Sequence, residues 1–236
     1  MSNISAIFWR EFKAYFNSPI AYIVIPLFLI ITGWFFSSSL FLMNQASLRQ
    51  MFSVIPAIFI FFIPAVTMRL IAEEKKNGTF EILATLPTTD MEIVVGKFLS
   101  ALCFVAVFLL LTFPQVVTVM ALGDAELGPI LGGYLGVLMM AAAYLSIGLF
   151  ASSLTDNQII AFILAFVIAF AFFMVDKFLF MVPGPLVSMF EYLSMDYHFA
   201  NVAKGIIDTR DLVYYFSIIF MGLFLTGQSL AGRKWG

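Results

Sequence analysis

Long apolar runs dominate this 236-residue chain and leave it few folds to choose from. Several are about 20 residues or longer, the length that an α-helix needs to cross the hydrocarbon core of a bilayer. Charged residues make up 11% of the sequence, less than half of the roughly 25% found in soluble domains. We therefore predict an all-α membrane protein with six transmembrane helices. The predicted spans cover residues 19–43, 51–71, 91–120, 128–152, 157–181 and 212–230.

The spans take up most of the length, so we expect one transmembrane domain over residues 1–236. Residues 3–17 precede the first span and repeat apolar side chains every three or four positions, with Arg10 and Lys13 on another face. This pattern is typical of an amphipathic helix that lies in the membrane surface. Ser18 and Pro19 then favour a new helix, since proline suits a first helical turn.

Lysine and arginine are unevenly shared between the two sides of the predicted bundle. An even number of spans puts both chain termini on one side. The basic residues on that side are Arg10, Lys13, Arg69, Lys75, Lys76, Lys97, Arg233 and Lys234. The basic residues on the opposite side are Arg49, Lys177, Lys204 and Arg210. Because positive charge collects in cytoplasmic loops, we predict that both termini are cytoplasmic.

A polar stretch between the second and third spans, residues 72–90, is the main feature predicted for the cytoplasm. Asn77 and Gly78 interrupt its first helix, because glycine adopts positive φ without steric cost. Thr79 then precedes a short amphipathic helix that Pro87 ends. A bounded helix with apolar residues and Glu81 indicates an element that docks on a partner protein. The alternative is an ordinary solvated loop, whose charges keep it out of lipid.

The connection before the last span, residues 182–211, is the longest feature predicted for the other side. Its apolar stretch is too short and too charged to span a bilayer, so we predict two interfacial helices that cap the bundle. The only histidine of the chain, His198, lies in it. No second histidine, cysteine or carboxylate cluster accompanies His198, so we expect a hydrogen-bonded histidine and no metal site.

The fourth span carries a face of small residues that includes Gly132, Gly136 and Gly148. Small residues let helix backbones approach each other closely. We predict that this face packs within the chain, and a seam between two copies is the alternative. No ionisable residue lies clearly deep in a span, which speaks against a transporter driven by an ion gradient.

Two sets of residues resemble the ABC-2 type transporter permeases. The polar stretch is similar to their cytoplasmic coupling region in the run Glu73-Glu74-Lys75-Lys76-Asn77-Gly78-Thr79-Phe80-Glu81-Ile82-Leu83, followed by Pro87. The segment before the last span is similar to theirs in Leu193-Ser194, His198-Phe199, Gly205, Ile207-Asp208 and Asp211-Leu212-Val213-Tyr214. With the surface helix and six spans, the combination is most like the permeases of gliding-motility transporters and of transporters associated with multicopper enzyme maturation.

The resemblance implies an export-type permease subunit in the bacterial cytoplasmic (inner) membrane. The chain has no G-x-x-x-x-G-K-[ST] loop, so we expect no enzyme activity and no cofactor, with ATP and Mg bound by a partner ATPase. The implied ATPase-docking residues are Glu73, Glu74, Gly78, Thr79, Glu81, Leu83 and Pro87, with Arg69 as the hinge. The implied outer gate is a re-entrant helical pair that contains Leu193, His198, Phe199, Gly205 and Asp208.

The resemblance also implies a second permease, identical or different, and an accessory membrane subunit with a large extracytoplasmic domain. The lipid bilayer is the remaining partner, since a net charge of −2 gives no reason to expect nucleic acid. Two other functions stay open on the sequence alone. One is an ion-coupled secondary transporter, and the other is a membrane assembly factor that transports nothing.

Overall fold

The computed structural model describes residues 3–79, 88–123, 126–179, 184–206 and 208–232. Over these ranges the regular elements are helices. In chain order they are α1 (Asn3–Phe16), α2 (Pro19–Leu42), α3 (Arg49–Thr67), α4 (Ala72–Lys76), α6 (Asp90–Leu110), α7 (Phe113–Leu122), α8 (Leu127–Ser153), α9 (Gln158–Lys177), α10 (Gly184–Leu193), α11 (Met195–Ala203) and α12 (Thr209–Gly232).

Six helical stretches are long and apolar enough to cross a membrane, which confirms the predicted all-α fold with six spans. They are Pro19–Leu42, Arg49–Lys76, Asp90–Leu122, Leu127–Ser153, Gln158–Lys177 and Thr209–Gly232. The stretch Leu127–Ser153 is the most buried of them, at 78%, whereas Gln158–Lys177 is 17% buried. Most of the stretch Gln158–Lys177 therefore faces out of the bundle, where lipid or another chain would cover it.

The second and third of these stretches are interrupted. Between α3 and α4 the chain makes a turn over residues 68–71. Between α6 and α7 the break follows from Pro114, which lacks an N–H and whose ring clashes with the carbonyl four residues earlier. There the Thr112 hydroxyl donates to the Leu109 carbonyl at 2.7 Å and lies 2.6 Å from the Tyr134 hydroxyl. The third span, predicted over residues 91–120, is the apolar stretch Asp90–Leu122, which consists of the two helices α6 and α7.

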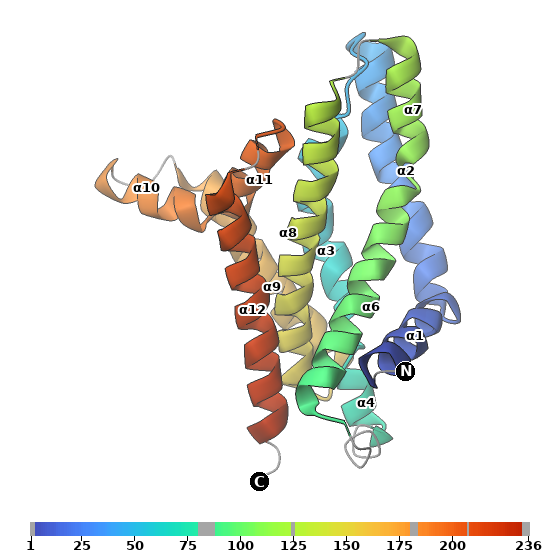
Figure 1. Ribbon diagram of the computed structural model, residues 1–236, viewed down its shortest axis with the longest axis vertical. Helices are drawn as coiled ribbons and strands as arrows, with labels where there is room; N and C mark the ends of the chain where they lie inside the picture. The colour runs from blue at the N-terminus through green and yellow to red at the C-terminus, as the bar shows by residue number, and fades with distance from the viewer. Residues whose placement is uncertain (1–2, 80–87, 124–125, 180–183, 207, 233–236) are drawn as a thin grey trace.

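Helix α8 is the centre of the bundle and packs against α3, α6, α9, α11 and α12 (Figure 1). Its small residues make these contacts close. At Gly133 an added Cβ atom would lie 2.3 Å from the Phe52 ring of α3. On the α12 side, Ser146 of α8 lies against Gly222 of α12. A Cβ atom added at Gly222 would lie 2.6 Å from the Ser146 hydroxyl oxygen. These approaches explain why α8 is more buried than any other span.

The short helices gather at opposite ends of the bundle (Figure 1). At one end, called the α4 end here, α1 and α4 lie near the start of α6, and α12 ends at the same end of the bundle. At the other, called the α11 end, α10 and α11 connect α9 to α12. Helix α1 packs on α6, and the rings of Tyr15 and Phe104 stack with centroids 4.6 Å apart. Its placement in a membrane surface stays a prediction.

Candidate functional site

The turn between α3 and α4 is held by one side chain of α8, Ser152. Its hydroxyl accepts the backbone N–H groups of Ile71 and Ala72 at 3.2 and 3.1 Å. It also donates to the Met68 carbonyl at 3.1 Å. A break in a helix frees backbone groups that need partners, and this fully buried hydroxyl serves three of them. The turn is therefore fixed to α8.

A glycine one turn earlier in α8 lets the two helices come together at this turn. At Gly148 an added Cβ atom would lie 2.2 Å from the Thr67 hydroxyl oxygen and 2.9 Å from the Thr67 Cβ. Thr67 is the last residue of α3 and is fully buried. The close approach brings Ser152 within hydrogen-bonding distance of the turn.

The end of α8 also joins α4 to α12. The carbonyl of Ser153 accepts a hydrogen bond from the Lys75 ammonium of α4. It accepts a second from the Ser229 hydroxyl of α12 at 3.2 Å. Three helices thus meet at one carbonyl group, beside the turn that Ser152 holds.

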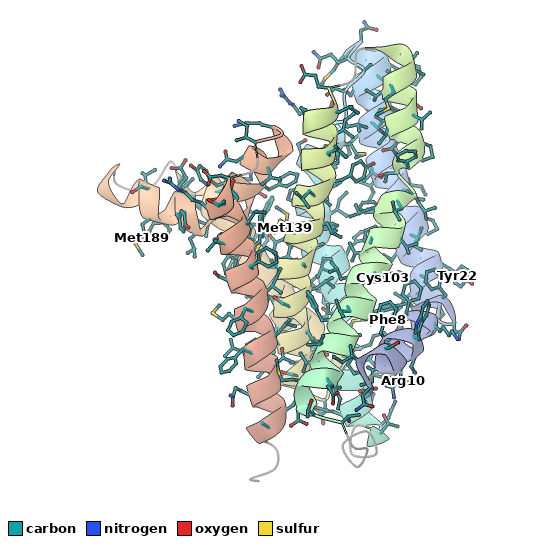
Figure 2. All side chains as sticks on the ribbon, viewed as in Figure 1. Phe8, Arg10, Tyr22, Cys103, Met139 and Met189 are labelled. Carbon is teal, nitrogen blue, oxygen red and sulfur yellow. The ribbon has the colours of Figure 1, made fainter. Side chains whose placement is uncertain are left out.

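An ion-pair network ties α4 to α1 and α6. Lys97 of α6 has no exposed side-chain surface, and its ammonium lies 3.1 Å from the Glu11 carboxylate and 2.9 Å from the Glu74 carboxylate. Arg10 of α1 bridges the same two carboxylates and lies 2.9 Å from that of Glu74. Figure 2 shows Arg10 at the α4 end of the bundle. The network lines a pocket of about 290 Å³ together with Tyr15 and the Arg69–Glu73 pair.

The charges in this network balance locally. Burial alone would raise the pKa of the Glu11 carboxyl, but the nearby charges of Lys97 and Arg10 outweigh it and hold that pKa below its usual range. Glu11 is therefore ionised at neutral pH. Two carboxylates then share a fully buried ammonium and a half-exposed guanidinium, so that no charge in the group is left unpaired.

The sequence-predicted docking residues fall partly on this network. Glu74 is at its centre, and Glu73 pairs with Arg69 at 2.9 Å across the turn. Gly78 has φ of +68°, which fits its predicted role in ending the first helix. The Thr79 hydroxyl donates to the Glu74 carbonyl at 3.3 Å. Glu81, Leu83 and Pro87 lie outside the described residues.

The residues predicted for the outer gate lie at the α11 end, where several fasten α10 and α11 to α12. His198 is buried; its Nδ1 atom lies 2.6 Å from an Asp211 carboxylate oxygen and its Nε2 atom lies 2.9 Å from the Tyr192 carbonyl. The carbonyl of Leu193 accepts the Tyr214 hydroxyl at 2.6 Å. The exposed Asp208 accepts the Arg210 N–H at 2.9 Å, near the start of α12.

The His198–Asp211 contact ties α11 to the first turn of α12 inside the protein, since both side chains are buried.

The predicted small-residue face of α8 contacts this same segment. At Gly132 an added Cβ would lie 2.2 Å from the Val202 carbonyl oxygen and 3.0 Å from the Cα of Gly205. At Gly136 it would lie 3.1 Å from the ring of Phe199. Gly205 itself has φ of +84° and fits against the backbone of residue 128. Gly132 and Gly136 thus pack on α11, while Gly148 packs on α3.

Sequence reasoning missed Ser152, Lys97, Glu11 and Asp211 as site residues. It placed Lys97 among the cytoplasmic cations and saw no ionisable group deep in a span. Lys97 lies within the third span and is fully buried there. The available signal was a lone cation that begins a long apolar run and that, once buried, needs a paired anion. Among the residues that the structure describes, no group of three or more histidine, cysteine or carboxylate side chains could hold a metal ion.

Replacing Ser152 by alanine tests whether its hydroxyl holds the turn between α3 and α4. It removes the partner of the Ile71 and Ala72 N–H groups, and an unsatisfied buried group costs about 1–3 kcal/mol. We expect backbone hydrogen exchange at residues 71 and 72 to rise roughly tenfold or more, since about 1.4 kcal/mol corresponds to a factor of ten. Hydrogen-exchange mass spectrometry in detergent measures it. Ser153→Ala is the matched control, because that hydroxyl donates to Phe150 within α8; equal exchange in the two variants would contradict the assignment.

Comparison with known proteins identifies one matching family. Residues 5–232 match the family model described as ABC-2 family transporter protein. The match covers both ends of the bundle and all six membrane-spanning stretches. No curated protein matches the chain.

Proposed function

The chain belongs to the ABC-2 family of transporter proteins, and from this premise we propose that it is the membrane subunit of an ATP-driven exporter. Members of this family are transmembrane permease components of ABC transporters and work with a separate ABC ATPase subunit. The family match over residues 5–232 is the observation that carries the proposal. ATP and Mg bind to the partner subunit, and this chain does no covalent chemistry.

The ATPase docks at the α4 end in this proposal. The excess of lysine and arginine at that end supports a cytoplasmic location, with both termini on the same side. The docking surface is the segment after α3, with Glu73, Gly78, Thr79, Glu81, Leu83 and Pro87 as contacts. Glu74 has a second role, because Lys97 and Arg10 already bind its carboxylate. Through these two ion pairs, Glu74 transmits a movement of α4 to α1 and α6.

The turn at residues 68–71 is the hinge in the mechanism. Arg69 lies in it and pairs with Glu73 one helical turn further on. Because Ser152 binds the backbone of this turn, a displacement of α4 acts on α8 as well as on α3. Helix α8 contacts α11 at the far end, so it connects the docking segment to the outer gate. One rigid helix thereby links the two ends of the subunit.

A second permease, identical or different, completes the transport unit in this proposal. The spans with the least burial support this, since α2 and α9 leave most of their apolar surface outside the bundle. An accessory membrane subunit with a large extracytoplasmic domain completes the assembly, in the manner of the gliding-motility and multicopper-enzyme transporters. Leu193, His198, Phe199, Gly205 and Asp208 belong to the outer gate, and the bacterial inner membrane is the location.

Replacing Glu81 by arginine tests the docking segment. Reversing one charge at the contact should lower the amount of ATPase subunit that co-purifies with the chain by tenfold or more, since a like-charge juxtaposition costs several kcal/mol. The measurement is the molar ratio of the two subunits after co-expression and affinity purification from detergent. Glu126→Arg at the opposite end is the control. A wild-type ratio in the Glu81 variant would refute docking there, and absence of any ATPase with the wild-type chain would refute the proposed function.

A further inference from the structure

The last part of the third span, α7, is joined to α6 where the helical hydrogen bonding is incomplete. Pro114 has no N–H to donate, so the carbonyl of Leu110 lacks its usual helical partner. The N–H of Thr112 donates to the Leu109 carbonyl, only three residues earlier, at 3.0 Å. Helices change direction at such places, because fewer backbone bonds hold the two parts in line.

Helix α7 has little packing that would fix its direction. Two of its ten residues, Val116 and Val119, are buried, whereas eleven of the 21 residues of α6 are. Phe113, Val117 and Leu122 of α7 are more than half exposed. Figure 1 shows α7 beside α2 at the edge of the bundle. Segments with few buried apolar contacts are the least stable parts of a fold, so a tilt of α7 as a unit breaks little.

A hydrogen bond between two side chains ties the α6–α7 junction to the central helix. The hydroxyl oxygens of Thr112 and of Tyr134 in α8 lie 2.6 Å apart. Thr112 is fully buried, and the Tyr134 ring makes an edge-to-face contact with Phe52 of α3, with centroids 5.2 Å apart. Tyr134 is therefore held by the core of the bundle, and its hydroxyl holds the junction in turn.

The contact of α7 with α2 leaves a polar atom unsatisfied. Gln115 lies against Gly33 of α2, where an added Cβ atom would be 3.7 Å from the Gln115 amide nitrogen. The Gln115 amide oxygen is buried and has no hydrogen-bond partner among the described residues. A buried acceptor without a donor raises the free energy of the arrangement that buries it. A tilt of α7 that brings this oxygen to a donor or to water therefore competes with the present arrangement.

Helix α7 also borders a groove of about 990 Å³ at the α11 end. Val119 of α7 and Ser39 of α2 line this groove, and so do Phe199 and Ala203 of α11. The groove thus lies between α7 and α11. A tilt of α7 changes the separation of these walls and with it the width of the groove.

We propose that α7 pivots about the Pro114 junction, and that the hydrogen bond between Thr112 and Tyr134 is the latch that holds it in the present arrangement. The pivot makes α7 a movable wall of the groove, opposite α11. It is a property of this chain alone and needs no ATPase partner.

Double electron–electron resonance on the full chain in nanodiscs tests the pivot. Spin labels at Val117 and Val213, with Cys103→Ala to remove the native thiol, report the distance from α7 to α12, and both positions are more than half exposed. We expect Tyr134→Phe, which removes the latch, to widen the distribution of label distances at least twofold. Pro114→Ala supplies the missing N–H and should make the distribution narrower than in the wild type.

Tyr22→Phe is the matched control, because it also removes a tyrosine hydroxyl but from a side chain of α2 that is 71% exposed. It should leave the distribution unchanged. Labels at Leu99 and Val213 report on α6 instead of α7, and Tyr134→Phe should not widen their distribution. Equal widths in the two tyrosine variants would overturn the proposal, as would a wild-type width in Pro114→Ala. Equal widening of both label pairs would overturn it too, since that result describes a loosened bundle.

Discussion

Replacing Lys97 by methionine is expected to lower the melting temperature of the purified protein by about 6–12 °C. The change removes the buried ammonium that Glu11 and Glu74 share and leaves both carboxylates with Arg10 alone. Removing one partner of a buried ion pair costs about 3–5 kcal/mol. Taking about 3 kcal/mol and roughly 2–4 °C per kcal/mol gives the expected shift. Differential scanning fluorimetry in detergent measures it.

Two further variants separate charge from packing at Lys97. Lys97→Met combined with Glu11→Gln and Glu74→Gln removes the uncompensated charges and should recover most of the melting temperature. Lys76→Met is the control, because Lys76 is exposed at the end of α4. A triple variant as unstable as the single one would show that the loss comes from packing, and the ion-pair account of Lys97 would fail.

Replacing Gly132 by alanine is expected to destabilise the α11 end by about 3 kcal/mol, at the upper end of what overpacking costs. The added methyl group would lie 2.2 Å from the Val202 carbonyl oxygen, which is backbone and cannot rotate away. Helix α11 must move off α8 to accept it. Hydrogen exchange over residues 195–205 should therefore rise by 100-fold or more, since about 2.7 kcal/mol corresponds to that factor.

Gly128→Ala is the matched control for Gly132→Ala. Both residues lie in α8, but an added Cβ at Gly128 meets no atom within 4 Å. The control gains helix propensity without a clash, so it should be neutral or slightly stabilising. If both variants exchange at the wild-type rate, then the close approach of α8 and α11 is not what holds the outer segment.

The spans were predictable because hydropathy is a local property. A run of about 20 apolar residues has one stable arrangement in a bilayer, whatever the rest of the chain does. The break at Gly78 was predictable for a similar reason, since its positive φ suits glycine whatever packs nearby. Pro114 in the sequence indicates the kink between α6 and α7, whereas the predicted third span did not include a kink.

The site depends on residues that meet only in the folded chain. Lys97 is stable inside α6 because Glu11, 86 positions earlier, and Glu74 face it. Ser152 reads as one more small residue of the fourth span, yet it binds the backbone of a turn 80 positions away. His198 was expected to be hydrogen bonded, but its partner Asp211 became apparent only with α12 in place. A periodic pattern along the sequence cannot reveal such pairs, because their members meet only in the folded chain.

The contact between His198 and Asp211 has a mechanical consequence. It joins α11 to α12, and both side chains are buried. Pulling α11 away from α12 would leave these polar groups without a partner, and an unsatisfied buried group costs about 1–3 kcal/mol. The outer segment and the last span are therefore expected to move as one body.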